Sequence, residues 1–165
     1  MPESRQVPPP CEFPLGRLLL KLDGVVRSDV KVVDEVVDTL RRLLQTAGCG
    51  EDLERTDLAT HEALTNAIIH GNRSSAGKWV RICLALQEDC GLRIQVKDVG
   101  AGFDPTGLAS PLEEANLLRG SGRGIFLIRQ LMDDVQFQFE DGTEISMQRN
   151  MRKDPKPLPS DAPRL

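Results

Sequence analysis

The stretch HEALTNAIIHGN at residues 61–72 combines an apolar helical face with two polar side chains one turn apart. Apolar residues recur near helical spacing from residue 57 to residue 70, which predicts an amphipathic helix. Glu62 and Asn66 then lie on one face of it, and we expect them to line a cleft beside a sheet. A carboxylate there can take a proton from a hydroxyl or water, and an amide oxygen can coordinate Mg²⁺.

A strand is predicted further along the chain, at residues 92–97, where apolar and polar residues alternate. The alternation stops at Asp98, which is followed by Gly100 and Gly102. A side chain at a strand end points reproducibly into a pocket, and a carboxylate in a mostly apolar pocket can accept a hydrogen bond from an exocyclic amine. The glycines would let the backbone come close to a flat ring.

A glycine-rich turn, Gly-Ser-Gly-Arg-Gly at residues 120–124, precedes a predicted helix at residues 125–132. Backbone N–H groups at a glycine-rich helix start, together with the helix dipole, form an anion site suited to phosphates. Arg119 and Arg123 could add positive charge. The turn also contains the start of a dinucleotide fingerprint, but a polar, loop-like segment precedes it instead of a strand, so we rank that interpretation low.

Each of these three elements also has a plain structural interpretation. A glutamate and an asparagine four residues apart on a helix are most often solvated surface. The pair Gly100 and Gly102 is more often simply a turn between apolar runs. The order and spacing of the three elements, not any one of them, favour a nucleotide site.

Taken together, the elements resemble the ATP-binding domain shared by gyrase-type topoisomerases, the Hsp90 chaperone, sensor histidine kinases and the mismatch-repair ATPase. Within that superfamily, residues 62–72 and 120–135 are most similar to the bacterial anti-sigma-factor serine kinases of the RsbW and SpoIIAB type. Gly142 and Thr143 also fall in the expected final strand. The resemblance covers roughly residues 13–150.

The resemblance implies a role for each matching residue. Glu62 would be the general base that activates a substrate serine or threonine hydroxyl, and Asn66 would ligate magnesium. Asp98 would accept a hydrogen bond from the adenine amino group, with the Thr143 hydroxyl and an ordered water beside it. Gly100 and Gly102 would pass under the base, and the phosphates would lie in a turn formed by Gly120, Ser121, Gly122, Arg123 and Gly124.

His70 stays outside this catalytic set. The subfamily often has a histidine at that position, but a histidine at a helix end near Gly71 can equally interact with the helix terminus.

The predicted elements indicate an α+β fold, a two-layer sandwich of a mixed, mostly antiparallel sheet with helices packed on one face. By resemblance this is the Bergerat, or histidine kinase-like ATPase, fold. A strand at residues 17–23 should end at Gly24, and Ser28 should cap a helix that ends near residues 47–48. Strands at residues 79–86 and 92–97 form one expected hairpin, and those at 135–140 and 143–148 form another.

Length and composition predict a single domain, which by resemblance is the ATP-binding domain at residues 13–150. The proline-rich ends at 1–12 and 151–165 are expected to be disordered, or at most docking tails. Residues 102–120 have few periodic apolar residues, and their position between two nucleotide-binding turns predicts a mobile lid over ATP. A tolerated surface loop is the alternative.

Composition limits the classes of partner. The 165 residues carry a net charge of −4 with no concentrated basic patch, which does not favour nucleic-acid binding. No apolar run or basic-then-apolar leader indicates a membrane span or a secretory signal. Four cysteines, at positions 11, 49, 83 and 90, form no CxxC pair and predict reduced thiols in a cytoplasmic protein, neither a disulfide frame nor a zinc site.

The resemblance implies an ATP- and Mg²⁺-dependent serine/threonine protein kinase that sequesters an RNA polymerase sigma factor and phosphorylates a small anti-anti-sigma protein. It also implies a homodimer that uses the first strand and helix. One alternative is a non-catalytic ATP-binding switch that regulates another partner and has no use for Glu62 as a base. A histidine kinase ranks low, because neither His61 nor His70 is placed to be the phosphoacceptor.

Overall fold

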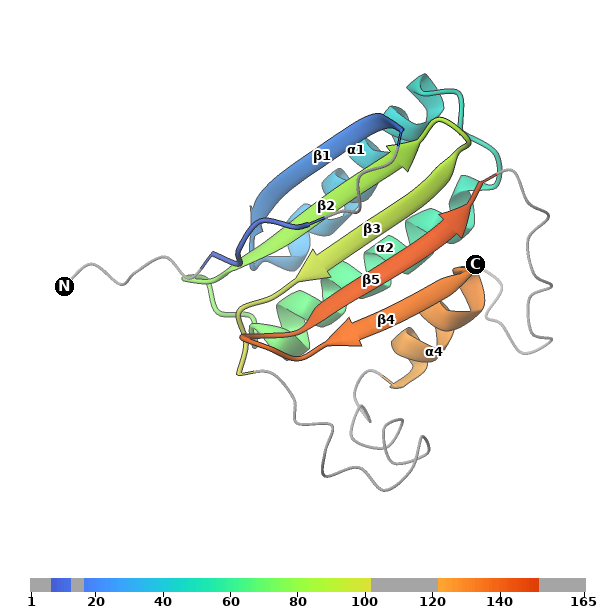
Figure 1. The fold of residues 1–165 in the computed structure, drawn as a ribbon. Helices are drawn as coiled ribbons and strands as arrows, with labels where there is room; N and C mark the ends of the chain where they lie inside the picture. Colours follow the sequence, from blue (N-terminus) through green and yellow to red (C-terminus); the bar gives the residue numbers. More distant parts are fainter. Residues whose placement is uncertain (1–6, 13–16, 102–121, 152–165) are drawn as a thin grey trace.

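The computed structural model of the chain describes residues 7–12, 17–101 and 122–151, and for residues 122 and 123 it describes the backbone only. None of the helices in these ranges is long and apolar enough to cross a membrane. Figure 1 shows the elements, which in chain order are β1 (Leu18–Arg27), η1 (Val30–Val32), α1 (Val33–Thr46), α2 (Leu53–Asn66), η2 (Ala67–Gly71), β2 (Trp79–Gln87), β3 (Gly91–Lys97), α4 (Gly122–Leu131), β4 (Asp134–Gln138) and β5 (Glu144–Asn150).

The strands form one five-stranded sheet in the order β1-β2-β3-β5-β4, and every pairing among them is antiparallel. Helices α1, α2 and α4 lie against the same face of this sheet (Figure 1). The predicted α+β class, with helices on one face of a mostly antiparallel sheet, is confirmed. Because β5 pairs with both β3 and β4, the segment after β3 crosses over before the sheet is completed.

The core lies between the sheet and the helices. In β3 the residues predicted to face inward, Leu92, Ile94 and Val96, are 2%, 0% and 0% exposed. Leu64 and Ile68 on the helical side are also fully buried. Burying each such side chain stabilises the fold by about 1.5–3 kcal/mol, so the rotation of α2 about its axis is firmly set. The polar edge of α2, which carries Glu62 and Asn66, is thereby held beside the sheet.

The first strand and helix differ in detail from the prediction. Gly24 does not end β1, because it pairs with Ile82 within a ladder that continues to Arg27. Ser28 is not the cap either. The side chain of Asp29 accepts a hydrogen bond from the N–H of Lys31 at 3.0 Å, while the buried Ser28 hydroxyl has no hydrogen-bond partner in the described part of the chain. A one-residue shift of this kind cannot be read from the sequence, since both residue types cap helices well.

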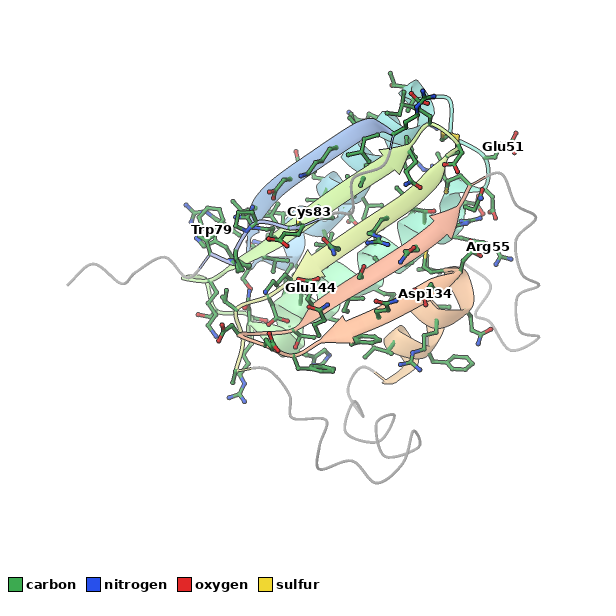
Figure 2. All side chains as sticks on the ribbon, in the orientation of Figure 1. Glu51, Arg55, Trp79, Cys83, Asp134 and Glu144 are labelled. Atoms are coloured by element: carbon green, nitrogen blue, oxygen red, sulfur yellow. A yellow bond between two sulfur atoms is a disulfide. The ribbon has the colours of Figure 1, made fainter. Side chains whose placement is uncertain are left out.

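The cysteines overturn one expectation. They form two disulfides, Cys11–Cys83 and Cys49–Cys90, so the prediction of four reduced thiols is wrong. The paired residues are 72 and 41 positions apart in sequence, and only the sheet register and the course of residues 7–12 bring them together. Their Cα atoms are 6.3 and 5.7 Å apart, within the range that a disulfide spans. Figure 2 shows Cys83 near the middle of β2.

Candidate nucleotide-binding site

Asp98 follows β3 directly and is 2% exposed. Its Oδ1 accepts hydrogen bonds from the N–H of Gly100 at 2.8 Å and of Thr143 at 3.1 Å. The N–H of Asp98 donates to the Thr143 carbonyl at 3.0 Å. Among the described residues, every hydrogen bond to this carboxylate goes to Oδ1, so Oδ2 can accept from a further donor.

Burial sets the electrostatics of this carboxylate. Desolvation raises the pKa of Asp98 above its ordinary value, because it disfavours the charged form. The N–H groups of Gly100 and Thr143 lower the pKa and partly offset this effect, as do the charges of Lys78 and Lys97. The ionised carboxylate is therefore poorly solvated, and a donor group that contacts it would form a strong hydrogen bond.

Three glycines let the backbone close around Asp98. A Cβ on Gly71 would overlap Oδ2 of Asp98, and one on Gly100 would overlap the Gly71 carbonyl. Gly142 has a φ of +114°, and a Cβ there would overlap the Asp98 carbonyl. Only glycine fits at Gly142 on both counts. Of these three, only Gly100 was predicted to contact the nucleotide. Gly71 closes the 61–72 stretch, and Gly142 was expected in the final strand without a role in the site.

Asn72 was missed as a site residue, although it is fully buried. Its Nδ2 donates to the Trp79 carbonyl at 3.1 Å, and its Oδ1 accepts from the N–H of Val99 at 3.1 Å. The Asn72 N–H donates to the Ala67 carbonyl at 2.8 Å, which closes the π-helical turn η2. One amide thus ties the end of the helix to the start of β2 and to the turn after Asp98. Turns of this π type often occur at functional sites.

Glu62 and Asn66 lie where α4 begins. A Cβ built on Gly124 would be 2.7 Å from Oε2 of Glu62, 3.3 Å from Nδ2 of Asn66 and 3.6 Å from its Oδ1. The first turn of α4 therefore packs directly on the polar edge of α2. The N–H groups of that turn have no partner within the helix and carry the positive end of its dipole.

The donor set fits a magnesium ion. Nδ2 of Asn66 is buried without a hydrogen-bond partner among the described residues. Turning the amide over exchanges its nitrogen and oxygen, which would place a hard oxygen ligand in the same position. Buried polar groups are rarely left without a hydrogen-bond partner, and a ligand bound between α2 and α4 would provide one for the Asn66 amide.

Part of the predicted site lies outside the described residues. This holds for Gly102, Gly120 and Ser121, for the side chain of Arg123 and for the expected lid at 102–120. Of the remaining predicted residues, Glu62, Asn66 and the backbone of α4 lie together at one end, and Asp98, Gly100 and Thr143 lie together at the other. Both groups adjoin the segment that runs from α2 through η2.

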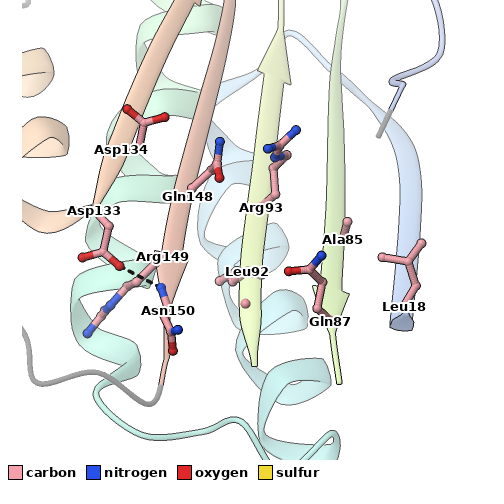
Figure 3. A pocket seen from close by; sticks show the side chains of 11 residues that line it. Leu18, Ala85, Gln87, Leu92, Arg93, Asp133, Asp134, Gln148, Arg149 and Asn150 are labelled. Carbon is pink, nitrogen blue, oxygen red and sulfur yellow. Dashed lines mark hydrogen bonds between the residues drawn. The ribbon is translucent and has the colours of Figure 1, made fainter. Parts of the chain in front are cut away.

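A cavity of about 260 Å³ lies elsewhere, on the sheet near the start of β3 and the end of β5 (Figure 3). Gln87, Arg93, Gln148 and Asn150 are among its lining residues. The N–H of Asn150 donates to Oδ2 of Asp133 at 2.8 Å on its rim. No predicted nucleotide-site residue lines this cavity, and Asp98 follows the other end of β3.

Comparison with known proteins identifies the family of the chain. The sequence profile of the histidine kinase-like ATPase domain matches residues 26–149. The serine-protein kinase RsbW of Staphylococcus epidermidis is 33% identical over 124 residues, 70% of this chain and 77% of the relative. RsbW of Staphylococcus aureus strain Newman is 32% identical over 137 residues, 78% of this chain and 86% of the relative.

Two solved structures share the fold. The RsbU and RsbW domains of a Mycobacterium tuberculosis protein align with a TM-score of 0.56 at 18% identity, over 79% of this chain and 32% of that longer one. The SiaB–SiaC complex of Pseudomonas aeruginosa aligns with a TM-score of 0.54 at 15% identity, over 80% of this chain and 89% of that one. The chain therefore belongs to the histidine kinase-like ATPase family, in the group that contains the serine-protein kinases RsbW.

Proposed function

We propose that this protein is an ATP-dependent serine/threonine protein kinase that also acts as an anti-sigma factor. It sequesters an RNA polymerase sigma factor and phosphorylates a small anti-anti-sigma antagonist. The kinase name of its relatives supports the reaction. The observation that carries the proposal is the contact between the start of α4 and the pair Glu62 and Asn66, because it joins a base, an amide and an anion-binding helix start.

The adenine end of ATP binds at Asp98. Oδ2 accepts from the adenine amino group, and Thr143 and an ordered water complete the ring contacts. Gly100 would pass under the base, and so would Gly102, which lies outside the described residues. The phosphates bind at the start of α4, at the backbone of Gly122, Arg123 and Gly124. Gly120 and Ser121, outside the described residues, would contribute by resemblance.

The reacting end lies at Glu62. Its carboxylate takes the proton of the substrate hydroxyl as that oxygen bonds to the γ-phosphorus. The bond from the γ-phosphorus to the β,γ-bridging oxygen breaks, and ADP leaves with that oxygen. Asn66 would hold a Mg²⁺ ion, which when bound neutralises charge on the phosphate oxygens.

Phosphorylation of the antagonist adds about −1.5 to −2 charges, which would repel it from the kinase and leave the kinase free to hold the sigma factor. The protein acts as a cytoplasmic homodimer in this scheme. Strand β1 lies at the edge of the sheet, and its Leu19 and Val25 are 50% and 38% exposed. These features support β1 as the surface that would contact a second copy of the chain. Light scattering of the purified chain tests the dimer.

The experiment is a pull-down from the host with and without ATP, followed by transfer of γ-phosphate to each recovered protein. We expect a sigma factor and a small protein phosphorylated on serine or threonine. Recovery of neither would leave nucleotide binding alone. The second candidate, a non-catalytic ATP-binding switch, predicts no transfer and an unchanged result for Glu62→Ala. A loss of transfer in Glu62→Ala with nucleotide affinity preserved would exclude it.

A further inference from the structure

Cys83 is buried on the sheet face that no described helix covers. Its neighbours in β2, Ile82 and Leu84, belong to the core on the helical face, whereas Cys83 does not, yet it is 0% exposed. Residues 7–12 provide its cover through the Cys11–Cys83 disulfide and through Arg81, whose Nε donates to the Pro8 carbonyl at 2.8 Å. The N-terminal segment thus lies on the open face over β2 (Figures 1 and 2).

We propose that Cys11 and Cys83 are a redox-responsive thiol pair, whose disulfide latches residues 7–12 onto the open face of the sheet and whose reduction releases them. The proposal is independent of the kinase reaction, since it uses no nucleotide-site residue. The open face of the sheet then has two states. In the oxidised state residues 7–12 cover it, and in the reduced state it is exposed to solvent.

The second disulfide shows why this pair is the responsive one. Cys49 and Cys90 are members of the main core, 4% and 2% exposed, and hydrogen bonds hold both of their segments in place. The N–H of Cys49 donates to the Leu44 carbonyl at 3.0 Å, and the Cys90 carbonyl accepts from Met151 at 3.1 Å. Breaking that bond leaves both sulfurs packed. By contrast, residues 7–12 are joined to the sheet by the disulfide and by the hydrogen bond from Nε of Arg81 to the Pro8 carbonyl, and they form no helix or strand.

In the reduced state the Cys83 thiol has a hydrogen-bond acceptor nearby. The sulfur of Cys83 lies 3.4 Å from Oδ1 of Asp23, which can accept from the S–H once the disulfide is broken. Asp23 stays in place because NH1 of Arg81 donates to the same oxygen at 2.5 Å. The Cys83 thiol therefore has a hydrogen-bond acceptor before and after the segment leaves, so release does not leave an unpaired donor on β2.

Reduction proceeds by two exchanges with a dithiol. A thiolate of the reductant attacks the sulfur of Cys11, which is 8% exposed while Cys83 is fully buried. The Cys11–Cys83 bond breaks, Cys83 leaves as a thiolate and takes a proton, and a mixed disulfide forms on Cys11. The second thiol of the reductant resolves it, so the protein gains two electrons and two protons and the reductant becomes a disulfide.

The test uses the full chain and ¹⁵N relaxation at the amides of Val7, Cys11 and Glu12, since the prolines between them have no N–H. The oxidised protein should give the heteronuclear NOE of ordered backbone, and reduction should lower it to that of a mobile tail. Cys11→Ser should give the low value in both redox states. The double variant Cys49→Ser with Cys90→Ser should keep the full redox response.

Differential alkylation in graded dithiol buffers should show Cys11 and Cys83 reduced before Cys49 and Cys90. A chelator is included, because the ligand atoms of Cys11, Asp23 and Cys83 lie within 4.8 Å of one another and free thiols there could take a thiophilic cation. Unchanged NOE values on reduction, or a redox response that persists in Cys11→Ser, would overturn the proposal. Reduction of the Cys49–Cys90 bond first would do the same.

Discussion

Oδ1 of Asp98 and the N–H of Thr143 lie 3.1 Å apart and join the end of β3 to the start of β5. The reverse bond, from the Asp98 N–H to the Thr143 carbonyl, makes the contact reciprocal. The residue assigned to the adenine amine thus continues the β3–β5 pairing by one residue beyond the ladder, which ends at Lys97 and Glu144. Its position depends on backbone atoms of a distant segment, which makes it rigid before any ligand arrives.

Replacing the carboxylate tests the adenine assignment. Asp98→Asn keeps the shape but puts an amide where the adenine amine must donate, and we expect ATP affinity to fall about 10- to 100-fold, the effect of losing a hydrogen bond to a charged group. Isothermal titration with ATP measures it. Asp134→Asn, on the exposed edge strand β4, is the matched control and should bind as the wild type does.

The raised pKa of Asp98 predicts how ATP affinity changes with pH. Only the ionised carboxylate is a full acceptor, so affinity should weaken as the pH falls through the folded-state pKa, which lies above the ordinary 3.8. In Asp98→Asn this dependence should vanish. Titrations of both proteins from neutral pH down toward 3.8 measure this dependence. A wild-type profile parallel to that of the variant would contradict the assignment.

The raised pKa of Asp98 makes the free energy of unfolding change with pH in the opposite direction to ATP affinity. The folded state holds the proton of Asp98 more tightly than the unfolded state, so the contribution of this group to the free energy of unfolding is greatest below pH 3.8 and is lost as the pH rises through the folded pKa. The stability of Asp98→Asn relative to the wild type should therefore increase with pH over that window. Urea unfolding of both proteins at a series of pH values measures the difference.

Asn72 should stabilise the site through both of its hydrogen bonds. Asn72→Ala leaves the Val99 N–H and the Trp79 carbonyl without their partner, and we expect the free energy of unfolding to fall by about 2–4 kcal/mol. Denaturant unfolding tests this. Gln136→Ala, whose side chain is exposed on β4, should change it by less than about 0.5 kcal/mol. Equal effects of the two changes would show that the buried bridge contributes nothing.

Gly124 should control the position of Glu62. In Gly124→Ala the new methyl group would lie 2.7 Å from Oε2 of Glu62, so the carboxylate or the start of α4 must move. A displacement of about 1 Å at a catalytic group can slow a reaction about 100-fold, and we expect that loss in phosphoryl transfer. Gly24→Ala is the control, because its methyl group would be 4.0 Å from its nearest neighbour, Cδ2 of Leu22.

Local pattern predicted the parts of the site that depend on one element. Helical spacing put Glu62 and Asn66 on one edge, and the alternation in β3 put Asp98 at a strand end. Both placements follow from which residues are apolar. The contacts of Asn72, Gly71 and Gly142 were not predictable in this way, because each depends on how close two segments come in space.

The disulfides were missed for the same physical reason. Bridging Cys11 to Cys83 requires residues 7–12 to lie on the open face, and no periodic pattern in a proline-rich segment predicts where it docks. Cys49 meets Cys90 only because the loop before α2 reaches the turn between β2 and β3. Spacing along the chain predicts metal and redox motifs, but it does not predict pairs that tertiary contacts create.

The bond between Asp98 and Thr143 also has a consequence for synthesis. The two residues are 45 positions apart, so on the ribosome the adenine end of the site must wait for the last hairpin. At about 5–20 residues per second that interval is roughly 2–9 s. A nascent chain that has exposed α2 and β3 therefore does not yet have the contact between Asp98 and Thr143. ATP bound as proposed can stabilise the domain only once Thr143 has left the ribosome.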